Sequence, residues 1–380
     1  MPVTLHWFLP SSGDTRADPR LADAVSALSG TADQRRDRDG IRVADPDYLG
    51  QIARAAEQLG FVGALTPTSS ECHDAWILGA ALAQHTERLK FLVAFRPGLI
   101  SPTLAAEQAA AFQRFSGGRL LLNIVTGGED AEQRRYGDGL SKDERYARTG
   151  EFLHIFSELW RGEPVSFAGE RLWVDDAVLA DPPAWPTIYF GGSSPAAIEV
   201  AARHAEVYLT WGEPPAQVTE KLDRVRASAA RHGRAPRFGI RLHVIARPDA
   251  ADAWQQAERL IAGLSPDQIA RAQAAQATAQ SEGQRRMTAL HGGDVSALEI
   301  APNLWTGIGL VRGGAGTALV GSYDEVADRI GEYHRLGIDE FILSGYPHLE
   351  EAYHVGEGVR PALARRGLLA DAEDPLAGVA

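Results

Sequence analysis

The sequence of 380 residues has little that would place it outside a reducing, aqueous compartment. It has one cysteine, Cys72, so no disulfide can form within the chain, and it has no run of 18 or more apolar residues of the kind that forms a transmembrane helix. Residues 1–10 lack the basic leader and cleavage site of a signal peptide and are interpreted as a first strand. We therefore expect a cytoplasmic protein with no membrane partner.

The chain also has fewer positively charged than negatively charged side chains. Lys and Arg number 38 against 50 Asp and Glu, which gives a formal net charge of −12. A field of this sign repels nucleic acid and anionic membranes, so neither is expected as a partner. An anionic substrate would need a local group of Arg or Lys side chains. No His or Cys spacing typical of a metal site stands out, so no metal is expected.

Strand-like apolar segments alternate with segments of helical periodicity. The eight strand-like segments are residues 3–10, 63–67, 90–97, 119–127, 187–192, 207–212, 237–246 and 340–345. The alternation predicts parallel strands, and eight such units predict an α/β fold of the (β/α)8 TIM-barrel class. The alternative is a doubly wound open sheet, but no G-x-G-x-x-G follows the first strand. Residues 1–365 are assigned to one barrel domain and 366–380 to a tail.

Insertions are expected after strands 1, 4 and 7. Residues 11–44 form a long polar segment, 162–175 are suited to a hairpin, and 249–320 form the largest insertion. The last begins with two Ala- and Gln-rich helical segments and ends in a Gly-rich stretch, residues 307–321. Because barrel chemistry lies at the C-terminal ends of the strands, insertions there typically form lids or shape specificity.

The seventh strand carries two polar side chains in an apolar setting. Arg241 and His243 are two residues apart, so both point to the same face, and the apolar residues around them point to the other. A buried Arg is costly without an anion, so the pair predicts an anion site. A structural ion pair is the alternative. Arg312 precedes two glycines, which suits either a mobile loop that delivers it to the site or a solvated side chain.

Other polar and aromatic residues end strands or begin helices. Gly191, Gly192, Ser193 and Ser194 lie where a strand passes into a helix, a pattern that predicts a phosphate cradle, although the serines also suit a helix cap. Strand ends carry Asn123, Thr126, Trp211 and Tyr346, and the two aromatics would either wall a pocket or plug the barrel. Cys72 lies beside His73 in a loop, but a lone loop cysteine is usually not a nucleophile.

Over nearly its whole length the chain resembles the bacterial-luciferase-like flavin monooxygenases, and within them the alkanesulfonate monooxygenases. The resemblance is carried by long runs, chiefly residues 189–194, 209–215, 238–245, 302–321 and 344–351. It implies a two-component system in which a separate NAD(P)H-dependent FMN reductase supplies FMNH2. With O2 as co-substrate, the C–S bond of an organosulfonate is cleaved and sulfite and an aldehyde are released. It also implies a homodimer or homotetramer.

The resemblance assigns site residues by position. The residues that match the sulfonate-contacting set are Trp211, Arg241, His243, Arg312 and Tyr346. Arg312 would arrive on a closing lid. The residues that match the flavin site are Ala94, which would back the ring, Asn123, Thr126, Tyr146, Gly191, Gly192, Ser193 and Ser194, with Cys72 tuning the pocket.

One segment departs from the resemblance. Residues 11–44 are longer than expected for simple alkanesulfonate enzymes, and close relatives act on sulfoquinovose, so a sulfonated sugar stays open as the substrate. Two rival hypotheses use other chemistry. A deazaflavin (F420)-dependent oxidoreductase on the same barrel would transfer hydride without O2, and a non-catalytic flavin-binding protein would bind FMN and release no sulfite.

Overall fold

Eight parallel strands close into a barrel in the computed structural model, which describes residues 1–15 and 41–369. The strands pair in the order β10-β9-β6-β5-β4-β1-β15-β11, and pairing of β10 with β11 closes the circle. Each strand coincides with a predicted segment, and only β11 extends one residue beyond its segment, so the predicted barrel is confirmed. The barrel strands are β1 (Thr4–Phe8), β4 (Gly63–Thr66), β5 (Lys90–Phe95), β6 (Leu120–Ile124), β9 (Thr187–Gly191), β10 (Val207–Trp211), β11 (Arg237–Arg247) and β15 (Glu340–Ser344).

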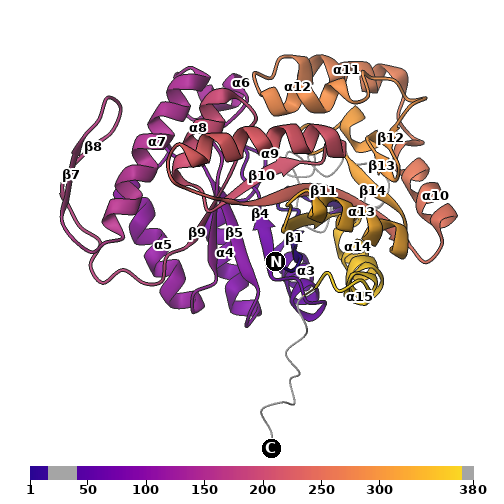
Figure 1. Cartoon of the computed structure of the whole chain (residues 1–380), viewed down its shortest axis with the longest axis horizontal. Helices are drawn as coiled ribbons and strands as arrows, with labels where there is room; N and C mark the ends of the chain where they lie inside the picture. The colour runs from indigo at the N-terminus through magenta and orange to yellow at the C-terminus, as the bar shows by residue number, and fades with distance from the viewer. Residues whose placement is uncertain (16–40, 370–380) are drawn as a thin grey trace, which may run out of the picture.

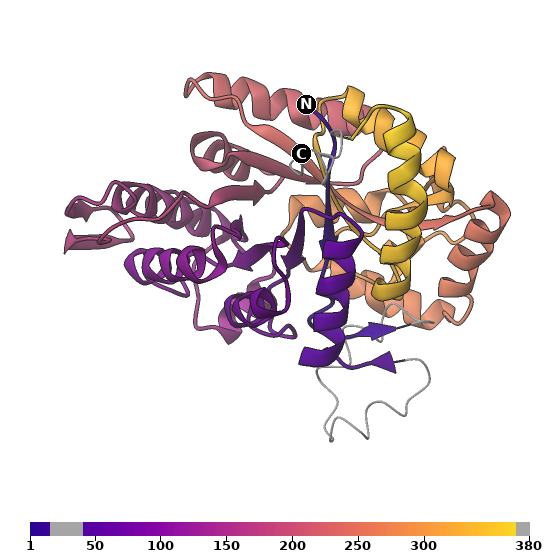
Figure 2. The same ribbon diagram turned by 90° about the horizontal axis from the view of Figure 1, so that it is seen from below.

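Helices follow the strands and surround the barrel (Figures 1 and 2). Four of them begin with a serine, at positions 101, 141, 194 and 322, whose side chain accepts a hydrogen bond from the backbone N–H three residues later. The surrounding helices are α3 (Pro46–Gln58), α4 (Ala75–Leu82), α5 (Pro102–Ser116), α7 (Lys142–Leu159), α8 (Pro195–His204), α9 (Pro215–Ala230), α13 (Tyr323–Arg335), α14 (His348–Tyr353) and α15 (Arg360–Arg365), with a π-helical segment, residues 354–359, between the last two.

Because side chains alternate between the two faces of a strand, the buried apolar residues form two clusters on opposite faces of the barrel wall. A small cluster that includes Phe8, Leu92 and Ile342 fills the barrel interior, while a larger one that includes Ile240 and Leu242 lies between strands and helices. Because successive strand residues alternate in direction, Arg241 must point inward. Its guanidinium carbon lies 4.6 Å from the centre of the Phe8 ring, which confirms the predicted orientation.

The insertion after the seventh strand is a subdomain of its own. It contains α10 (Ala250–Ile261), α11 (Pro266–Ala277), α12 (Glu282–Ala289), β12 (Glu299–Ala301), β13 (Leu304–Trp305), the 3-10 turn η3 (Gly307–Leu310) and β14 (Ala318–Ser322). Helices α11 and α12 lie side by side at the top of Figure 1. The end of the predicted Gly-rich stretch is not loop, because β14 pairs with the extension of β11. Helix α12 escaped prediction since it is short and polar and contains Gly283, which weakens helix propensity.

The other two insertions have different outcomes. The predicted hairpin is present as β7 (Val165–Ala168) and β8 (Trp173–Ala177), but it follows α7 and leads into β9, so it is not among the loops that leave strand ends. The first insertion begins and ends with a two-stranded ribbon, β2 (Asp14–Thr15) with β3 (Ile41–Arg42). Residues 16–40 between them, and 370–380 of the predicted tail, lie outside the described residues. Within the described part, no helix has the length and apolar character needed to cross a bilayer.

Candidate active site at the mouth of the barrel

A cavity of about 460 Å³ lies at the C-terminal ends of the strands, and α12 forms part of its wall. It gathers residues from six of the barrel strands and from their loops with Gly283 and Gln284 of the insertion. Eight of the predicted site residues line it: Asn123, Thr126, Tyr146, Gly191, Gly192, Ser193, Trp211 and Arg241. Side chains far apart in the sequence therefore meet where barrel chemistry is expected.

The predicted phosphate cradle forms a tight turn at the start of α8. Gly192 has φ of +139°, and a Cβ there would lie 2.6 Å from the Cβ of Ala197, so only glycine fits. Ser194 caps the helix by accepting the N–H of Ala197 at 3.3 Å, so the capping interpretation of this serine is confirmed. The helix N-terminus still presents backbone dipoles that favour an anion.

The cavity has polar groups that suit a phosphorylated cofactor. Thr126 Oγ1 is buried at the cavity wall and has no hydrogen-bond partner among the described residues. Burial raises the pKa of Tyr146, so its hydroxyl keeps its proton and serves as a donor. A neutral donor, an unsatisfied hydroxyl and a glycine turn at a helix start fit a phosphorylated, polar-edged cofactor.

Lys142 is a cavity residue that the sequence reasoning missed. It lies one helical turn before Tyr146 on α7, and both side chains line the cavity together with the glycine turn. Its Nζ donates to the carbonyl oxygen of Gln280 at 2.7 Å, and burial lowers its pKa. Lys142 and Tyr146 are four residues apart and therefore lie on the same face of α7, and this spacing could have identified Lys142 from the sequence.

The candidate anion site consists of two guanidiniums that lie over one aromatic ring. Arg241 is 7% exposed and donates to the backbone oxygen of Leu242 and to Ser344 Oγ, both at 2.7 Å. Arg312 lies 6.0 Å from the centre of the Phe8 ring, which Arg241 also covers. Burial, together with the charge of Arg312, lowers the pKa of Arg241 to about 9. No carboxylate in residues 1–15 or 41–369 forms an ion pair with Arg241, which argues against the structural ion-pair alternative.

His243 orients Arg241 through a shared hydroxyl. Its Nε2 lies 3.1 Å from the carbonyl oxygen of Ala315, which only accepts, so Nε2 carries the proton. Its Nδ1 then accepts from Ser344 Oγ at 2.7 Å, and that oxygen in turn accepts from Arg241. Burial, then the charges of Arg241 and Arg312, hold the pKa of His243 well below its usual value. His243 is therefore neutral near pH 7.

Tyr346 and a second histidine extend this cluster. The Tyr346 ring stacks on His243 at 5.5 Å, and His348 meets Tyr346 edge-on at 5.1 Å. His348 Nδ1 lies 2.9 Å from Asp14 Oδ1, while its buried Nε2 has no partner among the described residues. No local pattern in the sequence reveals this pair, because the carboxylate partner of His348 is 334 positions away.

Some predicted residues lie outside the cavity wall. His243, Arg312 and Tyr346 do not line the cavity, and His243 is connected to Arg241 through Ser344. Ala94 is buried in β5 and pairs with Asn123, which does line it. Cys72 is part-buried, with Sγ 3.2 Å from the hydroxyl of Ser69; Ser69 lines the cavity and Cys72 does not.

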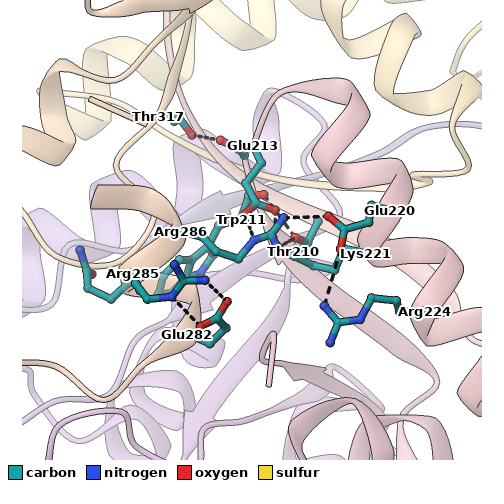
Figure 3. Close-up of polar contacts among 12 residues, drawn as sticks. Thr210, Trp211, Glu213, Glu220, Lys221, Arg224, Glu282, Arg285, Arg286 and Thr317 are labelled. Carbon is teal, nitrogen blue, oxygen red and sulfur yellow. Dashed lines mark hydrogen bonds and ion pairs between the residues drawn. The ribbon is translucent and has the colours of Figure 1, made fainter. Parts of the chain in front are cut away.

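Trp211 is held between the barrel and the insertion (Figure 3). A Cβ on Gly283 of α12 would lie 3.0 Å from the Trp211 ring, so the two are in close contact. Two residues after Trp211, the buried carboxylate of Glu213 pairs with Lys221 of α9 at 2.5 Å and with Arg286 of α12. One carboxylate thus ties the insertion to the barrel beside the cavity.

A closed barrel whose mouth joins a helix-start turn to the side chain of Arg241 has a candidate ligand site at its C-terminal face, where TIM-barrel enzymes carry their chemistry. Residues 24–340 match the model of the luciferase-like monooxygenases. The chain belongs to this luciferase-like monooxygenase family of flavin enzymes.

Solved structures with the same fold include three at 18–20% sequence identity. A riboflavin lyase solved with modified FMN and riboflavin has a TM-score of 0.78 at 20% identity, covering 98% of this chain and 94% of the other. EDTA monooxygenase from Chelativorans sp. BNC1 has a TM-score of 0.76 at 18% identity, with coverages of 97% and 95%. A long-chain alkane monooxygenase has a TM-score of 0.76 at 19% identity, with coverages of 98% and 94%. At these identities the likeness shows the fold.

The depressed pKa values of the anion site predict how sulfate binding changes with pH. Between pH 6 and 8 the dissociation constant for sulfate should stay constant, because His243 is already neutral and Arg241 still charged. Above about pH 9 Arg241 loses its proton in the free protein, so affinity should fall about ten-fold per pH unit. Isothermal titration calorimetry from pH 6 to 10 measures this. A dissociation constant that changes between pH 6 and 8 would contradict a neutral His243.

Proposed function

We propose that this chain is the oxygenase of a two-component system that uses FMNH2 and O2 to cleave the C–S bond of an organosulfonate. The buried Arg241, which has no carboxylate partner among the described residues and shares the Phe8 ring with Arg312, is the observation that carries the proposal. A sulfonate stays anionic near neutral pH and offers three oxygens, which two guanidiniums recognise by charge-assisted hydrogen bonds.

The reaction balances with two substrates and one reduced cofactor. A primary sulfonate, O2 and FMNH2 give an aldehyde, bisulfite, FMN and water. One oxygen atom enters the aldehyde and the other leaves in water. When bound, reduced FMN supplies the two electrons that activate O2, so a separate NAD(P)H-dependent FMN reductase is the partner that the proposal requires.

The chain's own residues would position and shield the reactants. Arg241 and Arg312 would hold the sulfonate, and the Ser344–His243 hydrogen bonds would fix the orientation of Arg241. The flavin phosphate would bind at the Gly192 turn, and Thr126 would donate to the polar edge of the ring. Trp211 and the insertion would cover the cavity and exclude water.

Sulfite release tests the proposal. Purified protein is supplied with an FMN reductase, NAD(P)H and O2, and sulfite is measured with octanesulfonate and with sulfoquinovose. Sulfite from the alkanesulfonate would establish a general alkanesulfonate enzyme, and sulfite from the sugar alone would direct attention to residues 11–44. Reduction of F420 without O2, and no sulfite from either sulfonate, would contradict the proposal.

Substitution of Lys142 tests the flavin half of the cavity. We expect Lys142→Ala to weaken FMNH2 binding about ten-fold, because it removes one cation beside the phosphate cradle. Sulfate affinity should stay unchanged, since the proposed anion ligand Arg241 lies on a different element, β11. Anaerobic fluorescence titration measures flavin binding. Lys90→Ala is the control, because Lys90 is exposed at the start of β5, and equal flavin affinity in the two variants would refute the assignment.

A further inference from the structure

Three glutamine side chains of the insertion bind the backbone of the segment that carries Arg312. Gln273 Nε2 donates to the carbonyl oxygen of Leu310 at 2.7 Å, and Gln276 Nε2 donates to that of Gly309 at 3.2 Å. On the other side of Arg312, Gln284 Oε1 accepts the N–H of Gly314 at 2.8 Å. The Gly-rich segment is therefore held by side chains on both sides of the arginine.

Two hydrogen bonds hold the Gln284 side chain in place independently of its contact with the glycine turn. It is buried, and its Nε2 donates to Gln276 Oε1 at 3.1 Å and to Thr288 Oγ1 at 3.2 Å. These two bonds leave Oε1 as the atom that faces Gly314. Gly314 has φ of +86°, and it lines the cavity with Gly313. A turn of two glycines has many accessible conformations, so an external hydrogen bond is needed to select one.

The same short helix also contacts Trp211, another residue that lines the cavity. Gly283 of α12 contacts the Trp211 ring, and Arg286 pairs with the buried Glu213 two residues after that tryptophan (Figure 3). Three of four consecutive residues of α12, Gly283, Gln284 and Arg286, thus contact Trp211, the Arg312 turn and the barrel strand end. Displacement of α12 would move Trp211 and Arg312 together.

We propose that α12 is the positioning element of the anion site and that Gln284 is the positioning residue for Arg312. The idea rests on the proposed function only in assigning Arg312 to a sulfonate. Through the Gly314 hydrogen bond, Gln284 fixes the backbone from which Arg312 reaches to within 3.5 Å of His243 Nε2 and lies over Phe8.

The test uses the full chain and a substitution of matched shape. Gln284→Met keeps the length of the side chain and removes the acceptor, while Gln284→Glu keeps an acceptor for Gly314. Gln255→Met is the control, because Gln255 is an exposed residue of α10 in the same insertion. The measurements are the amide hydrogen exchange of peptides covering residues 309–316, the dissociation constants of sulfate and FMN, and the KM and kcat for sulfite release.

In Gln284→Met we expect exchange at residues 309–316 to rise at least ten-fold and both the sulfate dissociation constant and the sulfonate KM to rise about ten-fold. The FMN dissociation constant should stay within two-fold. Gln284→Glu keeps the acceptor for Gly314 and should restore slow exchange at residues 309–316, and Gln255→Met should match the unmodified chain. Unchanged exchange, or faster exchange with unchanged sulfate affinity, would overturn the proposal.

The role of Gln284 can still be tested in two unfavourable cases. If the unmodified chain releases no sulfite from any sulfonate, the proposed function fails, but exchange and sulfate binding still decide whether Gln284 positions Arg312. If Gln284→Met does not fold, Gln284→Asn is used instead. Its side chain is one methylene shorter, so its amide oxygen no longer reaches the N–H of Gly314. Its sulfate affinity then gives the answer, with a ten-fold loss in support and no loss against.

Discussion

Replacement of Arg241 by Met is expected to abolish sulfite release and to make the protein more stable. The charged contact to the sulfonate contributes about 4 kcal/mol, so kcat/KM should fall about 1000-fold or more. The free energy of unfolding should rise by about 1–2 kcal/mol. Burial of a guanidinium without a counter-ion costs several kcal/mol, whereas the two hydrogen bonds that are lost are worth about 1 kcal/mol each.

Arg247 supplies the matched control on the same strand. It forms two hydrogen bonds with the buried carboxylate of Glu351, at 2.9 and 2.6 Å. Burial raises the pKa of Glu351 to about 7, and Arg247 opposes that rise. Arg247→Met should therefore destabilise the fold by about 3 kcal/mol, because it leaves that carboxylate buried and unpaired. Urea denaturation measures both variants, and a destabilised Arg241→Met would show that this arginine has a structural role.

Loss of the Glu213 carboxylate should cost the fold about 3–5 kcal/mol. In Glu213→Leu, Lys221 and Arg286 lose their common partner while Lys221 remains buried. Lys221, whose pKa burial already lowers, would then lose its proton more readily, which limits the penalty. Urea denaturation at pH 7 gives the change in free energy of unfolding, and FMN binding should weaken as α12 separates from the barrel.

Two further variants test whether the lost stability of Glu213→Leu comes from the loss of its buried carboxylate. Glu220→Leu removes a carboxylate that is half exposed and 3.7 Å from Arg286, so it should cost less than about 1 kcal/mol. The double variant Glu213→Leu with Lys221→Leu should recover part of the loss, since no lysine then remains buried without a partner. A Glu213→Leu variant as stable as the unmodified chain would contradict the role of this carboxylate.

Local patterns in the sequence were enough to predict the barrel. Each strand is a short apolar segment bounded by turn residues, and the serines that cap α5, α7, α8 and α13 are sequence-local signals. The inward direction of Arg241 followed from strand alternation alone. Helix α12 and the sheet extension through β14 did not follow, because their stability comes from packing against the barrel.

The sequence-based prediction named individual site residues but not the contacts between them. The sequence by itself determined which strand ends carry polar and aromatic side chains, because period and position are properties of the local chain. Only the tertiary structure decided that Arg241 lacks a carboxylate partner among the described residues, that Ser344 joins it to His243, and that Gln284 holds the Arg312 turn. These are contacts between segments 30 to 103 residues apart. Which atoms meet across such separations depends on how strands and insertion pack, and no local pattern encodes it.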